Sequence, residues 1–267
     1  MRQAALVFML MSMVAIAPAR AGGREDLIVQ NSTVVLRELQ RMPDQGVPDW
    51  LLQRAKGIAI MPNVVKVGLA LGGRGGSGVL HVRDEHGRWT NPSFIRIGGL
   101  SFGAQIGGQV TDLVLVFTTR QSIEGITDGQ TTLGADASVA AGPVGRTASA
   151  ATNLGLDKEV YSYSRSKGLF AGIALDGSVI SINRKANSKY YQQKDITVSD
   201  IFAGRVKAPG PGTRELLEEI SRATAAAPGG GAAGTAAGNG QSGTNPAAPA
   251  PARTFPMEDA HPGAEPR

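Results

Sequence analysis

Three short motifs hold residue types that could carry out chemistry, and the first of them is a run of glycines. Gly73-x-Gly75-x-x-Gly78 has the spacing of the loop that binds the pyrophosphate of a dinucleotide. That loop works only where a strand leads into a helix, because the N–H groups at the start of the helix hold the anion. The residues after Gly78 instead resemble a strand, a turn at residues 83–87 and a second strand. The pattern therefore predicts a glycine-rich hairpin and no nucleotide site.

The second motif is GLSFG at residues 99–103, which has the G-x-S-x-G spacing of a hydrolase nucleophile elbow around Ser101. A catalytic triad on this plan needs an acid and then a histidine later in the chain. The only histidine after Ser101 is His261, which lies in a tail that we expect to be disordered. We therefore interpret residues 99–103 as a glycine-rich bend and expect no enzymatic activity from Ser101.

Two further patterns lack the partners that their chemistry requires. Ser164-x-x-Lys167 matches the acylation motif of penicillin-recognising enzymes, but the accompanying Ser-Asp-Asn and Lys-Thr-Gly motifs are missing. Four possible metal ligands lie close together in the sequence: His81, Asp84, Glu85 and His86. Zinc sites generally use tighter, defined spacings and a ligand from elsewhere, so these residues predict a solvated polar turn and no metal site.

The first 21 residues have the pattern of a secretory signal peptide. Arg2 precedes an apolar run that ends at Ala17, and Ala19-Arg20-Ala21 supplies an A-x-A cleavage site. The run is shorter than the ~20 residues of a membrane-spanning helix, so we expect cleavage after Ala21. The sequence thus predicts an exported protein of the periplasm or cell envelope. The chain contains 0 Cys, which excludes disulfides, thiol catalysis and cysteine-based metal sites.

Charge and composition limit the remaining classes of function. Loss of residues 1–21 removes two arginines, which lowers the formal charge of the 267-residue chain from +5 to +3. So small a surplus does not indicate a nucleic-acid-binding protein. Residues 224–267 consist largely of Ala, Gly and Pro, and such a segment buries too little apolar surface to fold. We therefore expect one folded domain at residues 22–223, followed by a disordered tail.

Apolar periodicity predicts the elements of this domain. Helices are expected at residues 24–41 and 49–55, with Asp49 as the cap of the second helix. Ten short strands separated by glycine are expected at residues 57–61, 65–71, 78–83, 94–97, 104–108, 113–118, 137–141, 160–164, 169–175 and 179–183. A helical turn that Ser122 caps should lie among them, and a last helix, at residues 213–225, should be capped by Thr213. Together these elements predict an α+β fold, in which a curved, glycine-rich, mainly antiparallel sheet or barrel-like core carries N-terminal helices and a C-terminal helix.

The densest overlap of basic and aromatic side chains gives the candidate binding site: Lys56, Arg184, Lys185, Lys189, Tyr190 and Tyr191. Cationic side chains beside amphipathic rings suit the interface of an anionic membrane, where each charge contributes about 1 kcal/mol. Short basic clusters are also common on solvated surfaces, and charge alone leaves that alternative open.

Several longer strings occur in the order and approximate spacing of a known family, among them AKGIAIMP (55–62), WTNPSFI (89–95) and YSYSRSKGLF (161–170). Over about residues 25–222 the chain resembles the SYLF domain family. The resemblance implies a lipid-binding module without enzymatic activity or cofactor. Eukaryotic members are known for phosphoinositide binding, membrane remodelling and, in some cases, contact with actin. Those members use a basic helix at the start of the domain, whereas charges in residues 24–41 are balanced.

Combined with the export signal, the resemblance makes the anionic phospholipid of the cell envelope the expected partner. We therefore expect a non-catalytic periplasmic protein that associates peripherally with anionic membranes through the six residues of the candidate site. The alternative is a structural or protein-interaction module whose partner is another component of the envelope.

Overall fold

The computed structural model describes residues 23–41, 46–144, 158–166, 168–208 and 210–225. The predicted signal peptide lies outside these residues, as does all of the predicted tail beyond Ala225. The described residues belong to one compact unit that ends at Ala226.

Helix α1 (Arg24–Arg41) forms where the sequence predicts it. Its inner face buries Val29, Leu36 and Leu39, and its first turn carries two acidic residues that favour the positive end of the helix dipole. Helix α2 (Asp49–Arg54) also forms, but the prediction that Asp49 caps it is wrong. Pro48 occupies the cap position and no side chain caps the helix.

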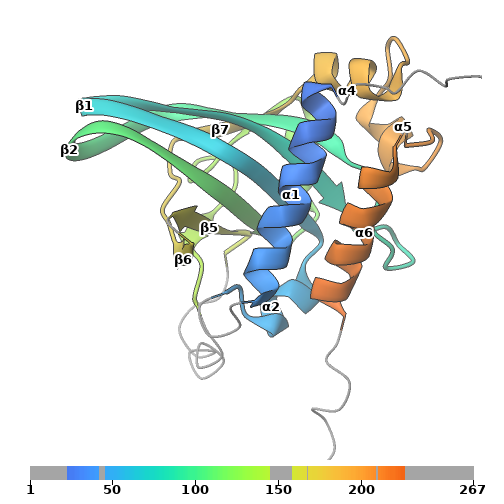
Figure 1. Cartoon of the computed structure of the whole chain (residues 1–267), viewed down its shortest axis with the longest axis horizontal. Helices are drawn as coiled ribbons and strands as arrows, with labels where there is room; N and C mark the ends of the chain where they lie inside the picture. Colours follow the sequence, from blue (N-terminus) through green and yellow to red (C-terminus); the bar gives the residue numbers. More distant parts are fainter. Residues whose placement is uncertain (1–22, 42–45, 145–157, 167, 209, 226–267) are drawn as a thin grey trace, which may run out of the picture. The chain divides into compact units, whose positions relative to one another are not determined.

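The six strands predicted between residues 57 and 118 are joined into two long strands, β1 (Gly57–Val82) and β2 (Ser93–Phe117). The two strands pair antiparallel from Gly57 opposite Phe117 to Leu80 opposite Ser93. A straight strand of 26 residues would be about 85 Å long. Instead, the ends of β1 meet, because the N–H of Arg83 donates to the carbonyl of Lys56 at 2.8 Å. The ribbon of β1 and β2 therefore doubles back on itself (Figure 1).

Glycines make this close approach possible. A Cβ atom placed on Gly78 would lie 2.2 Å from the carbonyl oxygen of Ile60, so only glycine fits there. The predicted glycine-rich hairpin forms, but residues 72–77, which fall between two of the predicted strands, lie inside β1 opposite residues 96–101 of β2. The turn occurs at residues 84–88, close to the predicted 83–87, where the N–H of Asp84 donates to the carbonyl of Arg88.

Five shorter strands complete the sheet: β3 (Gln130–Thr132), β4 (Val139–Ala141), β5 (Val160–Ser166), β6 (Leu169–Gly172) and β7 (Ser178–Ile182). The strand order is β3-β7-β2-β5-β4, with β1 paired to β2 and β6 paired to β5. All pairs are antiparallel except β4 with β5. The predicted α+β class with a curved, mainly antiparallel sheet is therefore confirmed (Figure 1).

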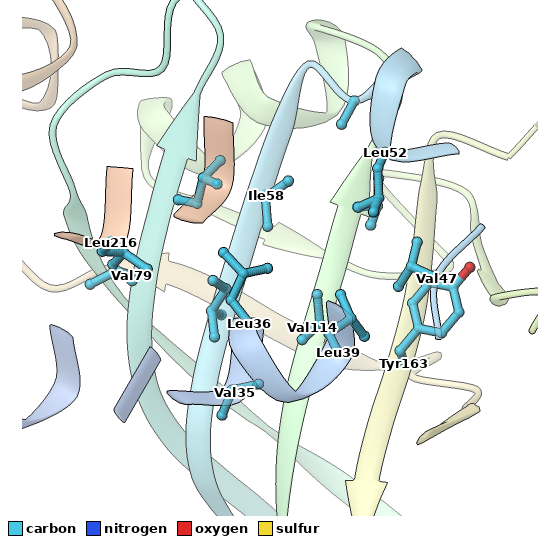
Figure 2. Packing of buried hydrophobic residues seen from close by; sticks show 14 of the residues in the cluster. Val35, Leu36, Leu39, Val47, Leu52, Ile58, Val79, Val114, Tyr163 and Leu216 are labelled. Atoms are coloured by element: carbon cyan, nitrogen blue, oxygen red, sulfur yellow. The ribbon is translucent and has the colours of Figure 1, made fainter. Parts of the chain in front are cut away.

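Hydrophobic cores lie on both faces of the sheet. On one face, Leu36 of α1 and Leu216 of α6 (Pro211–Thr224) pack over Ile58 and Val114 (Figure 2). Helices α1 and α6 lie side by side on that face (Figure 1). The prediction that Thr213 caps α6 is wrong, because the helix begins at Pro211 and Gly210 is its cap.

Three short helices lie in the second half of the domain: α3 (Gln121–Asp128), α4 (Arg184–Tyr191) and α5 (Val198–Phe202). The helical turn predicted at Ser122 is α3, but Arg120 holds its cap position, and the N–H of Ser122 instead donates to the hydroxyl of Thr119 at 3.3 Å. Helices α4 and α5 were not predicted. None of the helices in the described part of the chain has the length and apolar character that a membrane span requires.

Candidate functional site

Helix α4 carries five of the six residues of the predicted binding site. The side chain of Asn183 caps the helix by accepting a hydrogen bond from the N–H of Ala186 at 3.1 Å. Gln192, in the left-handed conformation, ends it. Only a few positions of this polar helix are buried, so its sequence has no apolar stripe that would have revealed it.

The inner face of α4 is fixed to β2 and α6 through buried side chains. The Asn187 side chain accepts a hydrogen bond from the N–H of Phe94 at 2.7 Å and donates one to the hydroxyl of Ser93. The rings of Tyr190 and Phe94 lie 4.9 Å apart between centroids, and the hydroxyls of Tyr190 and Thr213 share a hydrogen bond of 2.5 Å. These contacts hold the outer face of α4 in a defined position.

The structure corrects the predicted position of the two tyrosines. Tyr190 is 5% exposed, and Tyr191 donates its hydroxyl proton to the carbonyl of Pro92 at 2.8 Å. Burial raises the pKa of both phenols. Tyr190 therefore belongs to the packed interior, whereas Tyr191 is half-buried and packs against the core. The sequence shows that they neighbour basic residues, but it does not show which face of α4 they occupy.

The three basic residues of α4 lie on its outer side. Lys185 and Lys189 are one turn apart, and Arg184 lies beside them at the start of the helix. Arg184 and Lys185 are exposed, while Lys189 pairs with Glu25 of α1 at 2.7 Å yet keeps 63% of its side chain exposed. Lys56 is not part of this group. It follows α2, and Figure 1 places α2 and α4 at opposite ends of α1.

A polar cleft of about 730 Å³ lies beside α4. Arg184 and Ser188, one turn apart on α4, line one wall of it. The lining also includes a row of residues across three strands, since Ser181 of β7 pairs in register with Arg96 of β2 and with Gln130 of β3. The sequence gives no signal for this cleft, because its lining comes from segments that are distant along the chain.

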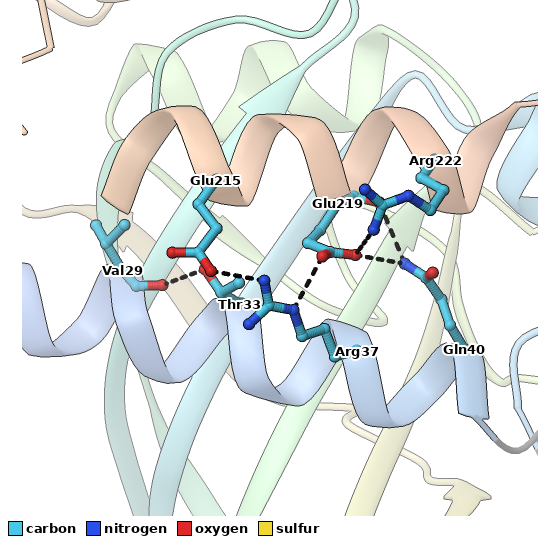
Figure 3. Close-up of polar contacts among 7 residues, drawn as sticks. All are labelled: Val29, Thr33, Arg37, Gln40, Glu215, Glu219 and Arg222. Carbon is cyan, nitrogen blue, oxygen red and sulfur yellow. Dashed lines mark hydrogen bonds and ion pairs between the residues drawn. The ribbon is translucent and has the colours of Figure 1, made fainter. Parts of the chain in front are cut away.

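The basic residue in the middle of α1 is engaged with α6 (Figure 3). Arg37 donates to Glu219 at 2.9 Å and to Glu215 at 2.6 Å, and these hydrogen bonds raise its pKa. Glu219 also accepts from Arg222 at 2.7 Å and lies within reach of Gln40. Arg37 therefore joins two helices, whereas Arg184 and Lys185 of α4 form no ion pair within the described residues.

Comparison with known proteins supports the resemblance seen in the sequence. The model of the Ysc84 family, described as "Las17-binding protein actin regulator", matches residues 98–223. Protein YSC84 of Saccharomyces cerevisiae is 42% identical over 177 residues, which cover 65% of this chain and 37% of that protein. The chain carries a Ysc84, or SYLF, domain.

Other proteins with a SYLF domain show the same partial overlap. LAS seventeen-binding protein 3 of S. cerevisiae is 41% identical over 169 residues, which cover 62% of this chain and 36% of that protein. The human SH3 domain-containing YSC84-like protein 1 is 38% identical over 192 residues, which cover 70% of this chain and 55% of that protein. The chain thus spans about half or less of the length of these relatives.

Within the part of the domain that the structure describes, the catalytic motifs of the sequence do not assemble into sites. Residues 99–103 continue along β2 as strand, without the helix that a nucleophile elbow requires. Ser164 lies in β5, and Lys167 falls outside the described residues. His81 is fully buried, and no group of three possible metal ligands is found among the residues that the structure describes. The Ysc84 family description is that of a binding and regulatory domain.

Proposed function

We propose that this chain is a non-catalytic, peripheral lipid-binding protein of the periplasm or cell envelope, which adsorbs to anionic phospholipid through α4. The observation that supports this proposal best is the outer face of α4. It presents Arg184, Lys185 and Lys189 to solvent, while the buried Asn187 and Tyr190 hold the helix against the domain. The export signal predicted at residues 1–21 supports the location.

The attraction to a membrane is electrostatic. Each cation near an anionic surface contributes about 1 kcal/mol, and the effect decreases within a Debye length of about 10 Å at 0.1 M salt. Lys189 pairs with the buried Glu25 but keeps 63% of its own side chain exposed, so its ammonium group remains accessible to lipid phosphate. Lys56, at the other end of α1, cannot share a flat contact with α4 and is expected to contribute little.

Replacement of all three α4 cations should weaken adsorption strongly. We expect the triple variant Arg184→Gln, Lys185→Gln, Lys189→Gln to bind vesicles of phosphatidylglycerol and phosphatidylcholine about a hundredfold more weakly than the parent. Sedimentation of the full chain with these vesicles, at low and high salt, measures the change. Lys56→Gln is the matched control and should bind nearly as well as the parent.

A folded triple variant that binds like the parent would exclude α4 as the lipid-binding surface. A parent that ignores both anionic and neutral vesicles would exclude lipid binding and favour the alternative, a protein-interaction module. Two observations support that alternative. The family model describes proteins that bind Las17 and regulate actin, and Val65 and Val110 lie opposite each other on the ribbon with about half of each side chain exposed.

A further inference from the structure

The cleft beside α4 contains charges of both signs that do not neutralise each other. Arg96 and Arg184 line it together with Asp128 and Asp195, and all four side chains are exposed. None of the four forms an ion pair with another described residue. Such a cleft can bind a ligand that itself carries both charges.

The basic groups are arranged to receive a phosphate. Arg184 is the first residue of α4, where the positive end of the helix dipole favours an anion. Arg96 stands beside Ser181 in the cross-strand row, and Ser188 adds a hydroxyl one turn along α4. The two guanidinium groups and the two serine hydroxyls can all donate hydrogen bonds to phosphate oxygens. A guanidinium group binds phosphate through paired hydrogen bonds.

The acidic groups come from other elements. Asp128 is the last residue of α3, where the negative end of the helix dipole favours a cation. Asp195, in the loop between α4 and α5, is held in the left-handed conformation with φ of 57°. A primary ammonium has three N–H donors, so it can be shared between these carboxylates.

We infer that the cleft binds a phosphate ester that carries a primary ammonium group, as the headgroup of an ethanolamine phospholipid does. The inference rests on the proposed lipid-binding function and adds to the anionic surface a zwitterionic headgroup, which is recognised in the cleft beside the same helix. A volume of about 730 Å³ is within the usual range of small-molecule sites. A choline headgroup has no N–H group that could donate to the two aspartates. Inorganic phosphate has no cationic group that could pair with them.

The first experiment uses soluble ligands and the full chain. Isothermal titration should show that O-phosphoethanolamine binds at least about tenfold more tightly than phosphocholine or inorganic phosphate. Arg96→Gln and Arg184→Gln should each lower the affinity for O-phosphoethanolamine at least about tenfold. Asp128→Asn and Asp195→Asn should remove the preference over phosphocholine. Lys207→Gln, at an exposed position outside the cleft lining and outside α4, should leave the affinity unchanged.

The second experiment separates a lipid from a soluble source of the same chemistry. Vesicles of phosphatidylcholine with and without phosphatidylethanolamine have the same net charge, so a gain in binding with ethanolamine lipid reports headgroup selection. If O-phosphoethanolamine binds and the vesicles do not differ, the site remains and its ligand is soluble.

Equal affinity for the three soluble ligands, or no binding of any of them, would overturn the inference. Persistent adsorption to anionic vesicles in that case would leave the proposed function standing, because that adsorption depends on α4 as a whole. If the chain also failed to adsorb to every kind of vesicle, the result would count against both the inferred headgroup site and the proposed lipid-binding function. Circular dichroism checks that the variants are folded. We expect them to fold, because the substituted side chains are exposed.

Discussion

His81 is a titratable residue enclosed in the domain. Its side chain is fully buried, and Nδ1 lies 2.9 Å from the carbonyl oxygen of Thr90. A carbonyl can only accept, so Nδ1 carries the proton of the neutral ring. Nε2 has no hydrogen-bond partner among the described residues, and burial lowers the pKa of His81 from 6.5 to about 4. The metal ligand considered in the sequence is therefore a neutral core residue.

Acid should destabilise the domain through His81. Its pKa in the folded state lies below that in the unfolded state, so the unfolded chain binds more protons between pH 6.5 and about 4. The free energy of unfolding should therefore fall as the pH falls through this window, by about 3 kcal/mol at its lower end. Urea unfolding at several pH values measures the slope. His81→Gln cannot titrate and should show a smaller slope; equal slopes in the two proteins would contradict the prediction.

Tyr190 distinguishes a core position from an interfacial one. Tyr190→Phe keeps the ring against Phe94 but removes the hydroxyl that pairs with Thr213. We expect a loss of about 1 kcal/mol in the free energy of unfolding and no change in binding to anionic vesicles. Denaturant unfolding and vesicle sedimentation measure the two effects. Weaker vesicle binding at unchanged stability would restore Tyr190 to the membrane interface.

Among the elements, the long ribbon of β1 and β2 depends on where its glycines lie. Gly78 and Gly73 belong to the same motif, but a Cβ atom on Gly78 would meet the backbone of Ile60 and Met61, while one on Gly73 would meet nothing within 4 Å. We expect Gly78→Ala to cost at least about 1 to 3 kcal/mol of stability, through overpacking and backbone shifts. Gly73→Ala is the control and should remain within about 0.5 kcal/mol of the parent. Thermal unfolding of both variants tests this prediction. Equal stabilities of the two variants would show that Gly78 does not approach the backbone of Ile60 and Met61 closely.

The same ribbon shows which elements the sequence can and cannot predict. The alternation from Val65 to Leu71 correctly predicts strand, because period two is a local property of the chain. Glycine is read as a break between strands, so six short strands were predicted in place of two long ones. The contact of Lys56 with Arg83 depends on how the ribbon folds back, and no local pattern contains that information.

For the candidate site, the sequence located the basic segment but not its geometry. Arg184, Lys185 and Lys189 do share one helix, as their closeness in the chain suggests. The burial of Tyr190 and the separation of Lys56 from α4 follow from tertiary packing. The cleft likewise depends on the register that places Arg96 beside Ser181.

At the scale of the whole domain, α1 and α6 lie side by side, and Arg37 joins them through Glu215 and Glu219, so this cation of the first helix is engaged within the domain. This arrangement differs from adsorption through a basic helix at the start of the domain. It predicts that the domain approaches a membrane with its α4 end, while the α2 end stays in water.

The absence of cysteine from the chain allows this orientation to be tested without background labelling. Gln193, just after α4, and Gln53, in α2, are both exposed, and either can be changed to cysteine and coupled to a polarity-sensitive fluorophore. On addition of anionic vesicles we expect a blue shift of emission at position 193 and little change at position 53, because the α4 end enters the less polar interface. High salt should reverse the shift, since the attraction is electrostatic. A shift at position 53 alone would mean that the domain docks by its α2 end, near Lys56, and that the cations of α4 face water.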